Sequence, residues 1–320
     1  MLRILLLLAC IALNAGALAQ QTYPSRAVRL LVGFAPGGST DIIARLIAPA
    51  LSEAFDRQFY IENRPGATGN IASDLAAKSA PDGTTLLMVA AGFASNVSVY
   101  PRPGYDPLRD FAPIARIAAS HNVLLVHRAL PVRTVGDLVD LVRRYPGQVS
   151  FASPGHGSTQ HLALELFKLR SGALNVLHVP YRGLGPAVFE VVGGQVHALF
   201  TTLPPAIAHI RSGRLRVLGV ASLKRMKLLP EVPTLDEAGY RGFEATGWNG
   251  VVAPVGTSYD IVTRLNLALT RIARSRSFTE RMENIGADVV GDTPDEFTAY
   301  LRSEIEKWAK VVERTGARIQ

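Results

Sequence analysis

Two stretches of this chain combine glycines with hydroxyl side chains at a point where an apolar segment ends. The first, at residues 33–41, reads GFAPGGSTD, and the second, at residues 153–159, reads SPGHGST. If a helix begins after each stretch, its free N–H groups and its dipole favour a bound anion such as a carboxylate or a phosphate. Each stretch is also compatible with a tight turn that only caps a helix, and the motif alone does not decide between the two.

In the first stretch, Gly37 and Gly38 let the backbone turn sharply and approach a ligand closely, so we expect their N–H groups to face the ligand. Ser39 and Thr40 add hydroxyl donors, and one residue of the three at 39–41 should cap the helix. A carboxylate that faced the ligand would repel an anion. We therefore expect Asp41 to accept backbone N–H bonds and to fix the loop instead.

A dinucleotide-binding fold is an alternative for this region. Glu62 follows Asp41 by 21 residues and ends a predicted strand, where an acid would meet a ribose hydroxyl. The glycines at 33, 37 and 38 do not form the G-x-G-x-x-G pattern, however, and the sequence contains no Walker A motif. We therefore expect no nucleotide cofactor.

Candidate catalytic and metal-ligating side chains gather in the second stretch. Ser158 with His156 or His161 could serve a hydrolase, but no G-x-S-x-G nucleophile elbow is present. The two histidines are five residues apart, which would put them on different faces of a helix. All seven histidines lie between positions 121 and 209, and no pair has H-E-x-x-H or similar spacing. We expect neither a catalytic residue nor a metal ion here.

The elements that must position these stretches alternate along the chain, which favours βαβ units and a mainly parallel sheet. The predicted strands are 28–34, 59–62, 84–90, 149–152, 176–179, 196–200, 215–220 and 248–254. The predicted helices are 41–55, with a kink at Pro49, and 71–79, 134–144, 159–169 and 186–192, and one that begins at Pro205. Thr134 and Asp137 form a variant of the capping box for the helix at 134–144.

The pattern starts again after about residue 120, and the chain ends in helices at 258–273, 277–285 and 294–314. This order predicts two α/β lobes, with crossings near 121–127 and 247–253. We expect residues 20–124 plus 247–320 to form lobe one and residues 125–246 to form lobe two.

Composition excludes few classes of protein. The 320 residues are 48% hydrophobic and 19% charged, which fits an ordinary globular protein of about two domains. The net charge of +8 could attract nucleic acid, an anionic surface or anionic small molecules. Because no basic run or basic stripe interleaved with aromatics occurs, we expect no nucleic-acid partner.

The first 19 residues have the pattern of a cleaved secretory signal. A single basic residue precedes the apolar run at 4–13, and ALA at 17–19 offers a cleavage site. The run is too short to span a bilayer, so we expect a periplasmic protein that begins at Gln20. Cys10, the one cysteine, resembles a lipoprotein box but fits better as apolar filler. The mature chain would then have no disulfide, thiolate or cysteine-ligated metal.

A longer series of segments resembles one family. In order, they include VRLLVGFAPGGSTDIIARL, YIENRPGATGN, APDGTTLLM, YDPLRDFAPI, ASPGHGSTQHLALELFK, HVPYRGLGPAV, GGQVHALF, VPTLDEAG and WNGVVAPVGT. Together they are similar to the Bug family, the periplasmic solute receptors of tripartite tricarboxylate transporters. The resemblance runs from Tyr23 to about Arg314 and implies a type II periplasmic-binding-protein fold. In this α/β fold, two lobes joined by two crossing strands close on one small ligand in the cleft between them.

The resemblance also implies where the ligand lies. Segments 34–41 and 91–96 match first-lobe loops, 153–159 matches the second-lobe loop, and 200–203 matches a strand end that lines the cleft. The expected ligand-binding residues are Phe34, Ala35, Gly37, Gly38, Ser39, Thr40, Asp41, Gly92, Asn96, Ser153, His156, Gly157, Ser158, Thr159, Thr201 and Thr202.

Two departures from the family bear on the ligand. Many relatives carry an acid with a polar neighbour where this chain has Thr201 and Thr202, so a ligand ammonium would lack a negative partner here. The segment AAGFASN at 90–96 is more apolar than in many relatives and favours an apolar or aromatic ligand body. A di- or tricarboxylate or an aromatic acid is therefore favoured over an amino acid.

The resemblance thus implies a monomeric receptor, without enzymatic activity or cofactor, that delivers a small carboxylate to a membrane permease. A ligand sensor for a signalling partner and a serine–histidine hydrolase are the alternatives.

Overall fold

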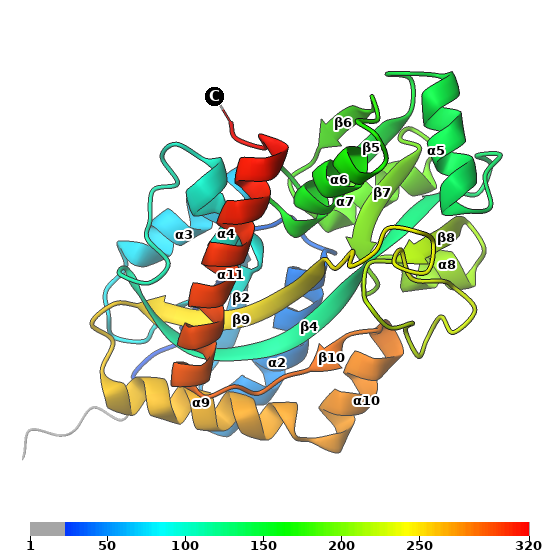
Figure 1. Cartoon of the computed structure of the whole chain (residues 1–320). Coiled ribbons are helices and arrows are strands. Elements are labelled where there is room, and N and C mark those ends of the chain that lie inside the picture. The colour runs from blue at the N-terminus through cyan, green and yellow to red at the C-terminus, as the bar shows by residue number, and fades with distance from the viewer. Residues whose placement is uncertain (1–22, 320) are drawn as a thin grey trace, which may run out of the picture.

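The computed structural model describes residues 23–319 of the chain (Figure 1). The predicted signal peptide, its cleavage site and Cys10 lie outside these residues. Strands β2-β1-β3-β9-β4-β7-β5-β6 form one sheet in that order, with β8 and β10 also paired to β4. Two α/β lobes are built on the two halves of this sheet, as the sequence predicts.

The first lobe starts as parallel βαβ units, because β1 pairs in parallel with both β2 and β3. A cluster of fully buried aliphatic side chains from β1, α2 and later helices packs under these strands. The elements are β1 (Val28–Val32), α2 (Ser39–Phe55), β2 (Phe59–Asn63), η1 (Ala67–Gly69), α3 (Asn70–Ala77), β3 (Thr85–Ala90) and α4 (Gly92–Val99).

Two features of this lobe differ from the sequence prediction. The segment 91–96, expected as a loop, instead forms the N-cap and the first residues of helix α4. Helix α2 begins at Ser39, two residues before the predicted start, and it continues past Pro49, which lies on the exposed side. Because proline has no N–H, the carbonyl group four residues earlier lacks its helical donor, and on this side of the helix water can donate to it instead.

Two long strands cross between the lobes (Figure 1). Strand β4 (Phe111–His127) pairs with β9 (Thr246–Pro254) from Phe111 as far as His121, and with β7 and β8 from Asn122 or Val123 onward. The change of partner falls at the start of the predicted crossing at 121–127. The sequence pattern indicated the crossing but not the full 17-residue length of β4.

The second lobe repeats the parallel arrangement, because β5 pairs in parallel with β6 and β7. Thr134 and Asp137 form the predicted capping box at the start of its first helix. Its elements are α5 (Val135–Arg144), β5 (Ser150–Ser153), α6 (Thr159–Arg170), β6 (Leu177–Pro180), α7 (Leu184–Val192), β7 (Ala198–Thr202), α8 (Ile207–Arg211) and β8 (Leu215–Val220).

The C-terminal elements return to the first lobe and then lean against the second. They are α9 (Tyr259–Ala273), α10 (Arg276–Ile285), β10 (Asp288–Val289) and α11 (Pro294–Thr315). Near the end of α11, Trp308 and Val312 are buried with Val99 of α4 and Leu162 of α6. Helix α11 therefore contacts both lobes, as Figure 1 shows in red.

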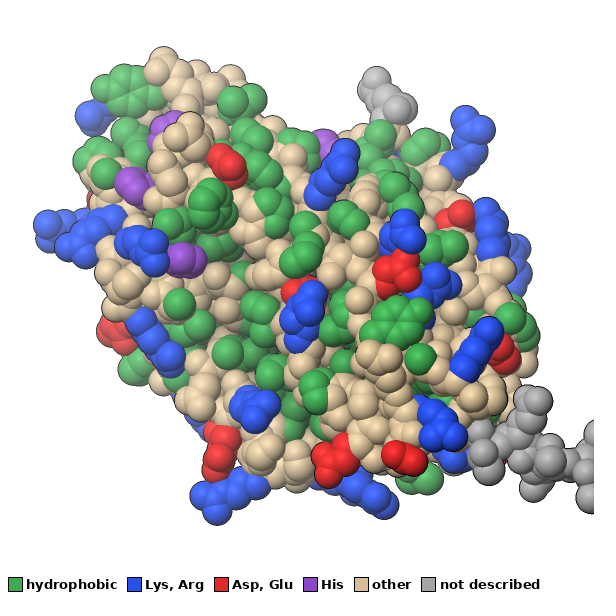
Figure 2. All heavy atoms as spheres, turned by 180° about the vertical axis from the view of Figure 1, so that it is seen from behind, with side chains coloured by type: hydrophobic (Ala, Val, Ile, Leu, Met, Phe, Trp, Pro, Cys, Tyr) green, Lys and Arg blue, Asp and Glu red, His purple; other side chains and the backbone are tan. Residues whose placement is uncertain are grey.

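One face of the molecule carries side chains of both charges without a stripe of either. Figure 2 shows lysine and arginine side chains spread over one face with acidic side chains among them. Among the residues from 23 to 319, no helix has the length and hydrophobicity that a bilayer span requires.

Candidate ligand-binding site

A cavity of about 40 Å³ lies between the closed lobes, with room for about three water molecules, so a larger ligand would enter only with some opening of the cleft. Both lobes and both crossing strands contribute to its wall. Its lining residues are Phe34, Gly38, Ser39, Thr40, Ala90, Ala91, Gly92, Ser120, Pro154, Ser158, Thr159, Gln160, Leu184, Thr202, Gly247, Trp248 and Asn249.

Four helices begin at this cavity. Helices α2 and α4 come from the first lobe, and α6 and α7 come from the second. Each contributes to the lining at its first turn or its N-cap: Gly38 to Thr40, Gly92, Ser158 to Gln160, and Leu184. Because a helix N-terminus carries partial positive charge and free N–H groups, their convergence makes the cavity attractive to an anion.

The positive potential comes from the backbone, because no Lys, Arg, Asp or Glu is among the residues that line the cavity in the described part of the chain. The polar side chains in the wall are neutral hydroxyls and amides. The Oγ of Ser120 is buried and has no hydrogen-bond partner among residues 23–319. Thr40 Oγ1 accepts from Asn249 Nδ2 at 3.0 Å, which leaves the threonine proton free to be donated.

The first-lobe loop is held from behind by a buried carboxylate. Asp41 accepts from Gly37 N at 3.0 Å, from Arg45 Nε at 2.9 Å and from Asn63 Nδ2 at 2.9 Å. Burial acts to raise the pKa of Asp41, but the hydrogen bonds from Arg45, Gly37 and Asn63 outweigh it, so the pKa is lowered. Asp41 fixes the loop as the sequence predicts, and it does not line the cavity.

The prediction that the Gly37 N–H faces the ligand is wrong. This N–H donates to Asp41 rather than to the cleft, and the φ of 81° at Gly37 requires the freedom of glycine. The N-cap of α2 is Gly38, which has no side chain to cap with, so none of the three candidates at 39–41 serves as N-cap. Gly38 does line the cavity, and an ideal Cβ there would lie 3.4 Å from Leu184 N in the other lobe.

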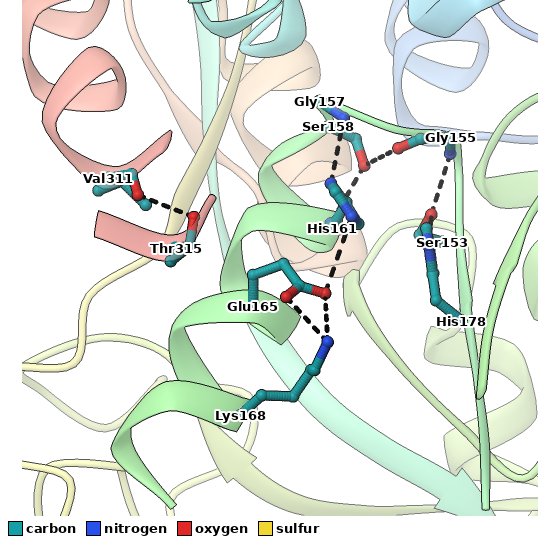
Figure 3. Close-up of polar contacts among 10 residues, drawn as sticks. All are labelled: Ser153, Gly155, Gly157, Ser158, His161, Glu165, Lys168, His178, Val311 and Thr315. Carbon is teal, nitrogen blue, oxygen red and sulfur yellow. Dashed lines mark hydrogen bonds and ion pairs between the residues drawn. The ribbon is translucent and has the colours of Figure 1, made fainter. Parts of the chain in front are cut away.

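The second-lobe loop is held by neutral groups. Ser158 is the N-cap of α6: its Oγ accepts from His161 N at 3.1 Å and donates to Gly155 O at 2.7 Å. Ser153 Oγ accepts from Gly155 N at 3.1 Å and contacts His178 Nε2 at 2.7 Å. Figure 3 shows these contacts around the start of α6.

The prediction that His156 and His161 lie on different faces of one helix is wrong. His156 precedes the N-cap of α6, so the chain turns between it and His161 instead of continuing as a helix. The two rings lie 5.1 Å apart, and His178 of β6 lies 4.9 Å from His156 and 4.5 Å from His161. Although close to these rings, the Ser158 hydroxyl bonds to backbone and not to an imidazole, so the serine–base contact of a hydrolase is not formed.

The lobes are closed on one another. Ser39 Oγ lies 2.5 Å from Thr202 Oγ1, and Ala35 N donates to Arg182 O at 2.9 Å. Away from the cavity, Thr68 Oγ1 and Tyr100 Oη donate to His156 O, and Ser95 Oγ donates to Gly157 O. Opening the cleft would break all of these contacts.

The expected ligand-binding residues divide into two groups. Phe34, Gly38, Ser39, Thr40, Gly92, Ser158, Thr159 and Thr202 line the cavity, whereas Ala35, Gly37, Asp41, Asn96, Ser153, His156, Gly157 and Thr201 do not. Several of the second group hold the loops or the closed lobes. Asn96, for example, lies within α4 and donates to Thr68 O at 3.1 Å.

Nine lining residues were not among the expected ligand-binding residues: Ala90, Ala91, Ser120, Pro154, Gln160, Leu184, Gly247, Trp248 and Asn249. Ala91 and Pro154 lie in segments that the resemblance pointed to, and their neighbours were chosen instead. Gln160 directly follows the predicted loop. The others come from β3, the crossing strands or α7, for which no local motif signals proximity to a ligand.

Comparison with known proteins places this geometry in a family context. The family described as "Tripartite tricarboxylate transporter family receptor" matches residues 43–317. The chain is 38% identical over 308 residues to protein BugT of Bordetella pertussis, covering 96% of this chain and 94% of the relative.

Two solved structures are also similar to the chain. Rpa4515 of R. palustris with adipate is 39% identical, with a TM-score of 0.89, and the match covers 92% of this chain and 98% of the other. MatC of Rhodopseudomonas palustris with bound malate is 31% identical, with a TM-score of 0.87, and the match covers 91% and 100%.

Proposed function

Because this chain belongs to the tripartite tricarboxylate transporter receptor family, we propose that it captures a small carboxylate between its lobes and delivers it to a membrane permease. The observation that carries this proposal is the convergence of four helix N-termini on one cavity, in whose wall residues 23–319 place no charged side chain. Backbone N–H groups and hydroxyls can hold a carboxylate there by charge-assisted hydrogen bonds.

The cavity also supports a choice among carboxylates. A ligand ammonium would enter a site without a carboxylate to pair with and would face the positive ends of four helices. Di- and tricarboxylates and aromatic acids are therefore favoured over amino acids. Two similar structures carry the dicarboxylates adipate and malate, which supports a dicarboxylate as the first class to test.

The receptor binds its ligand without chemical conversion in this proposal. The Ser158 hydroxyl serves as a helix cap and has no imidazole partner, which argues against a serine–histidine hydrolase. Closure of two lobes over a bound ligand is the motion by which such receptors sequester it. A sensor that presents the closed form to a signalling partner would use the same site and remains the second candidate.

The place of action follows from the family and the sequence. Receptors of this family are periplasmic, and the first 19 residues have the pattern of a secretory signal. We propose that the signal is cleaved after Ala19 and that the mature receptor is a monomer. Mass spectrometry of periplasmic protein should find an N-terminus at Gln20, and a lipidated Cys10 would contradict this.

A panel of carboxylates, read by the thermal shift of the purified receptor, tests the function. A ligand present at a hundredfold excess over its Kd should stabilise the fold by about 2.7 kcal/mol. We expect stabilisation by at least one dicarboxylate or aromatic acid, with the ligand recovered unchanged. Turnover of an ester, abolished by Ser158→Ala, would overturn the receptor function.

A further inference from the structure

We propose that His156, His161 and His178 form a binding site for a single transition-metal ion such as Zn²⁺ or Cu²⁺, on the second lobe. One ligand nitrogen of each lies within 4.8 Å of those of the other two. Residues 23–319 contain one group of three or more His, Cys, Asp or Glu side chains with this proximity. The site is additional to the proposed carboxylate site, because none of the three histidines lines that cavity.

The three rings come together through the fold and not through sequence spacing. His156 lies in the turn between β5 and α6, His161 lies in the first turn of α6, and His178 lies on β6, which pairs in parallel with β5. All three therefore belong to one lobe, and opening or closing of the cleft leaves their mutual geometry in place.

The spacing of the rings suits coordination. Around a tetrahedral Zn²⁺ with Zn–N bonds of about 2.0–2.1 Å, ligand nitrogens lie about 3.4 Å apart. The ring centroids here are 4.5–5.1 Å apart and one nitrogen of each ring lies within 4.8 Å of the others, so binding one ion requires the nitrogens to approach by up to about 1.4 Å. Three imidazoles favour Zn²⁺, Cu²⁺ or Ni²⁺ over Mg²⁺ or Ca²⁺, which prefer oxygen ligands.

Contacts around two of the rings decide which nitrogens can bind an ion. His161 Nδ1 accepts from Gly157 N at 3.2 Å, so an ion bound at this nitrogen would replace that hydrogen bond while Nε2–H stays directed at Glu165. Ser153 Oγ contacts His178 Nε2 at 2.7 Å and can accept its proton, which frees Nδ1 to bind an ion. Burial, followed by the neighbouring histidines, lowers the pKa of His161 to about 3 and that of His178 to about 4.

One neighbouring cation, Lys168, is paired with a carboxylate, and a second, Arg182, lines the cavity next to His156. Lys168 Nζ lies 2.9 Å from Glu165, whose carboxylate lies 3.9 Å from His161 Nε2 (Figure 3). His156 also lines a separate cavity of about 150 Å³ between the lobes, next to Gly155 and Tyr181. An ion can therefore approach His156 without passing through the carboxylate cavity.

Metal titration of the chelator-treated, full-length mature protein tests the site. Calorimetry with Zn²⁺ and Cu²⁺ should show one bound ion, and Mg²⁺ should give no binding. His156→Ala and His178→Ala should each weaken binding by at least about tenfold, while the matched control His127→Ala, which lies outside the cluster, should bind as wild type does. The electron paramagnetic resonance spectrum of bound Cu²⁺ should show coupling to imidazole nitrogens. The double variant with His156→Ala and His178→Ala should lose this coupling.

His156→Ala removes a half-buried ring from a turn and leaves intact the His156 carbonyl that contacts the first lobe, so the fold should persist. Circular dichroism of each variant checks this directly. Wild-type binding that is weaker than about 1 mM would overturn the site. An affinity unchanged in both His156→Ala and His178→Ala would show that the ion binds elsewhere and would also overturn it.

Discussion

The two loops that meet at the cavity perform the same task by different means. The first-lobe loop, Gly33 to Asp41, and the second-lobe loop, Ser153 to Thr159, each follow a parallel strand and lead into a helix. The first is fixed by an ionised and buried Asp41, whereas the second is fixed by hydroxyls and neutral imidazoles.

The two loops share the groups that they present to the cavity and differ only in the groups that hold them in place. Both loops present hydroxyls and a helix N-terminus to the cavity, and in the proposed function that presentation is what the carboxylate recognises. The anchors can differ in charge because the charged one, Asp41, does not line the cavity, whereas the neutral Ser158 does. Asp41 can remain ionised next to an anion site because Arg45, Gly37 and Asn63 satisfy its oxygens.

The largest effect should come from filling the space where the two loops meet. In Gly38→Val, the Cβ would lie 3.4 Å from Leu184 N, and the γ carbons would reach further into the cleft. We expect carboxylate affinity to fall by at least about a hundredfold, or about 3 kcal/mol, with the fold retained.

Calorimetry with the best carboxylate measures this loss. The matched control is Gly136→Val at the start of α5, outside the carboxylate cavity, which should leave affinity unchanged. Wild-type affinity in Gly38→Val would show that the first loop is only a capped turn and that the ligand binds elsewhere.

Replacing the charged anchor should affect stability as well as binding. Asp41→Asn removes the charge that holds Gly37 N and Arg45, so we expect the free energy of unfolding to fall by about 2 kcal/mol. Carboxylate affinity should fall less, because Asp41 acts only through the loop. Urea unfolding of the variant and of wild type gives the difference, and equal stability would contradict the anchoring role.

Because Asp41 is ionised in the folded chain, we also expect the free energy of unfolding to depend on pH. Hydrogen bonds lower the pKa of Asp41 in the folded chain, so the unfolded chain binds the proton more readily. The stabilisation is therefore full above the unfolded pKa of about 3.9 and is lost as the pH falls through the lower folded pKa. Between about pH 5 and 3, wild type should lose more stability than Asp41→Asn, and parallel unfolding profiles would refute this.

Removing the Ser158 hydroxyl, the neutral anchor of the second-lobe loop, should reduce carboxylate affinity less than Gly38→Val does. Ser158→Ala removes the cap of α6. Because the Ser158 hydroxyl already donates to Gly155 O, the loss acts through the loop, and the binding free energy should weaken by about 1 kcal/mol or somewhat more. In contrast to Asp41→Asn, no change in the acid limb of the stability profile is expected. A loss as large as that of Gly38→Val would mean that this hydroxyl carries the binding.

The smallest effect separates two adjacent threonines. Thr202→Val removes a hydroxyl that lines the cavity and contacts Ser39, so affinity should fall by no more than about 1 kcal/mol. Thr201→Val is its matched control, because Thr201 donates to the Thr202 carbonyl and lies outside the cavity wall. Equal losses in the two variants, measured by calorimetry, would contradict the assignment of the wall.

Local signals were sufficient for the loops and not for the rest of the wall. Glycines and hydroxyls before a helical pattern located both loops, and charge repulsion predicted that Asp41 would lie behind the loop. Asn249 reaches Thr40 across 209 residues, through the pairing of β9 with β3. Such a contact depends on strand register, which no short motif encodes.

The histidine cluster was missed for the same reason. His178 joins His161 only because β6 pairs beside β5, and His156 approaches because the chain turns at the helix cap. Spacing rules for metal ligands detect pairs on one helix and do not detect ligands that three elements bring together.

Calorimetric titration of the wild-type receptor with a dicarboxylate and with its diamide tests the central claim most directly. Adipate or malate should bind to a single site with a measurable heat, and the matching diamide should bind at least about a hundredfold more weakly, because helix N-termini favour the anion. Equal affinity for acid and diamide would contradict a site built from converging helix N-termini to hold a carboxylate.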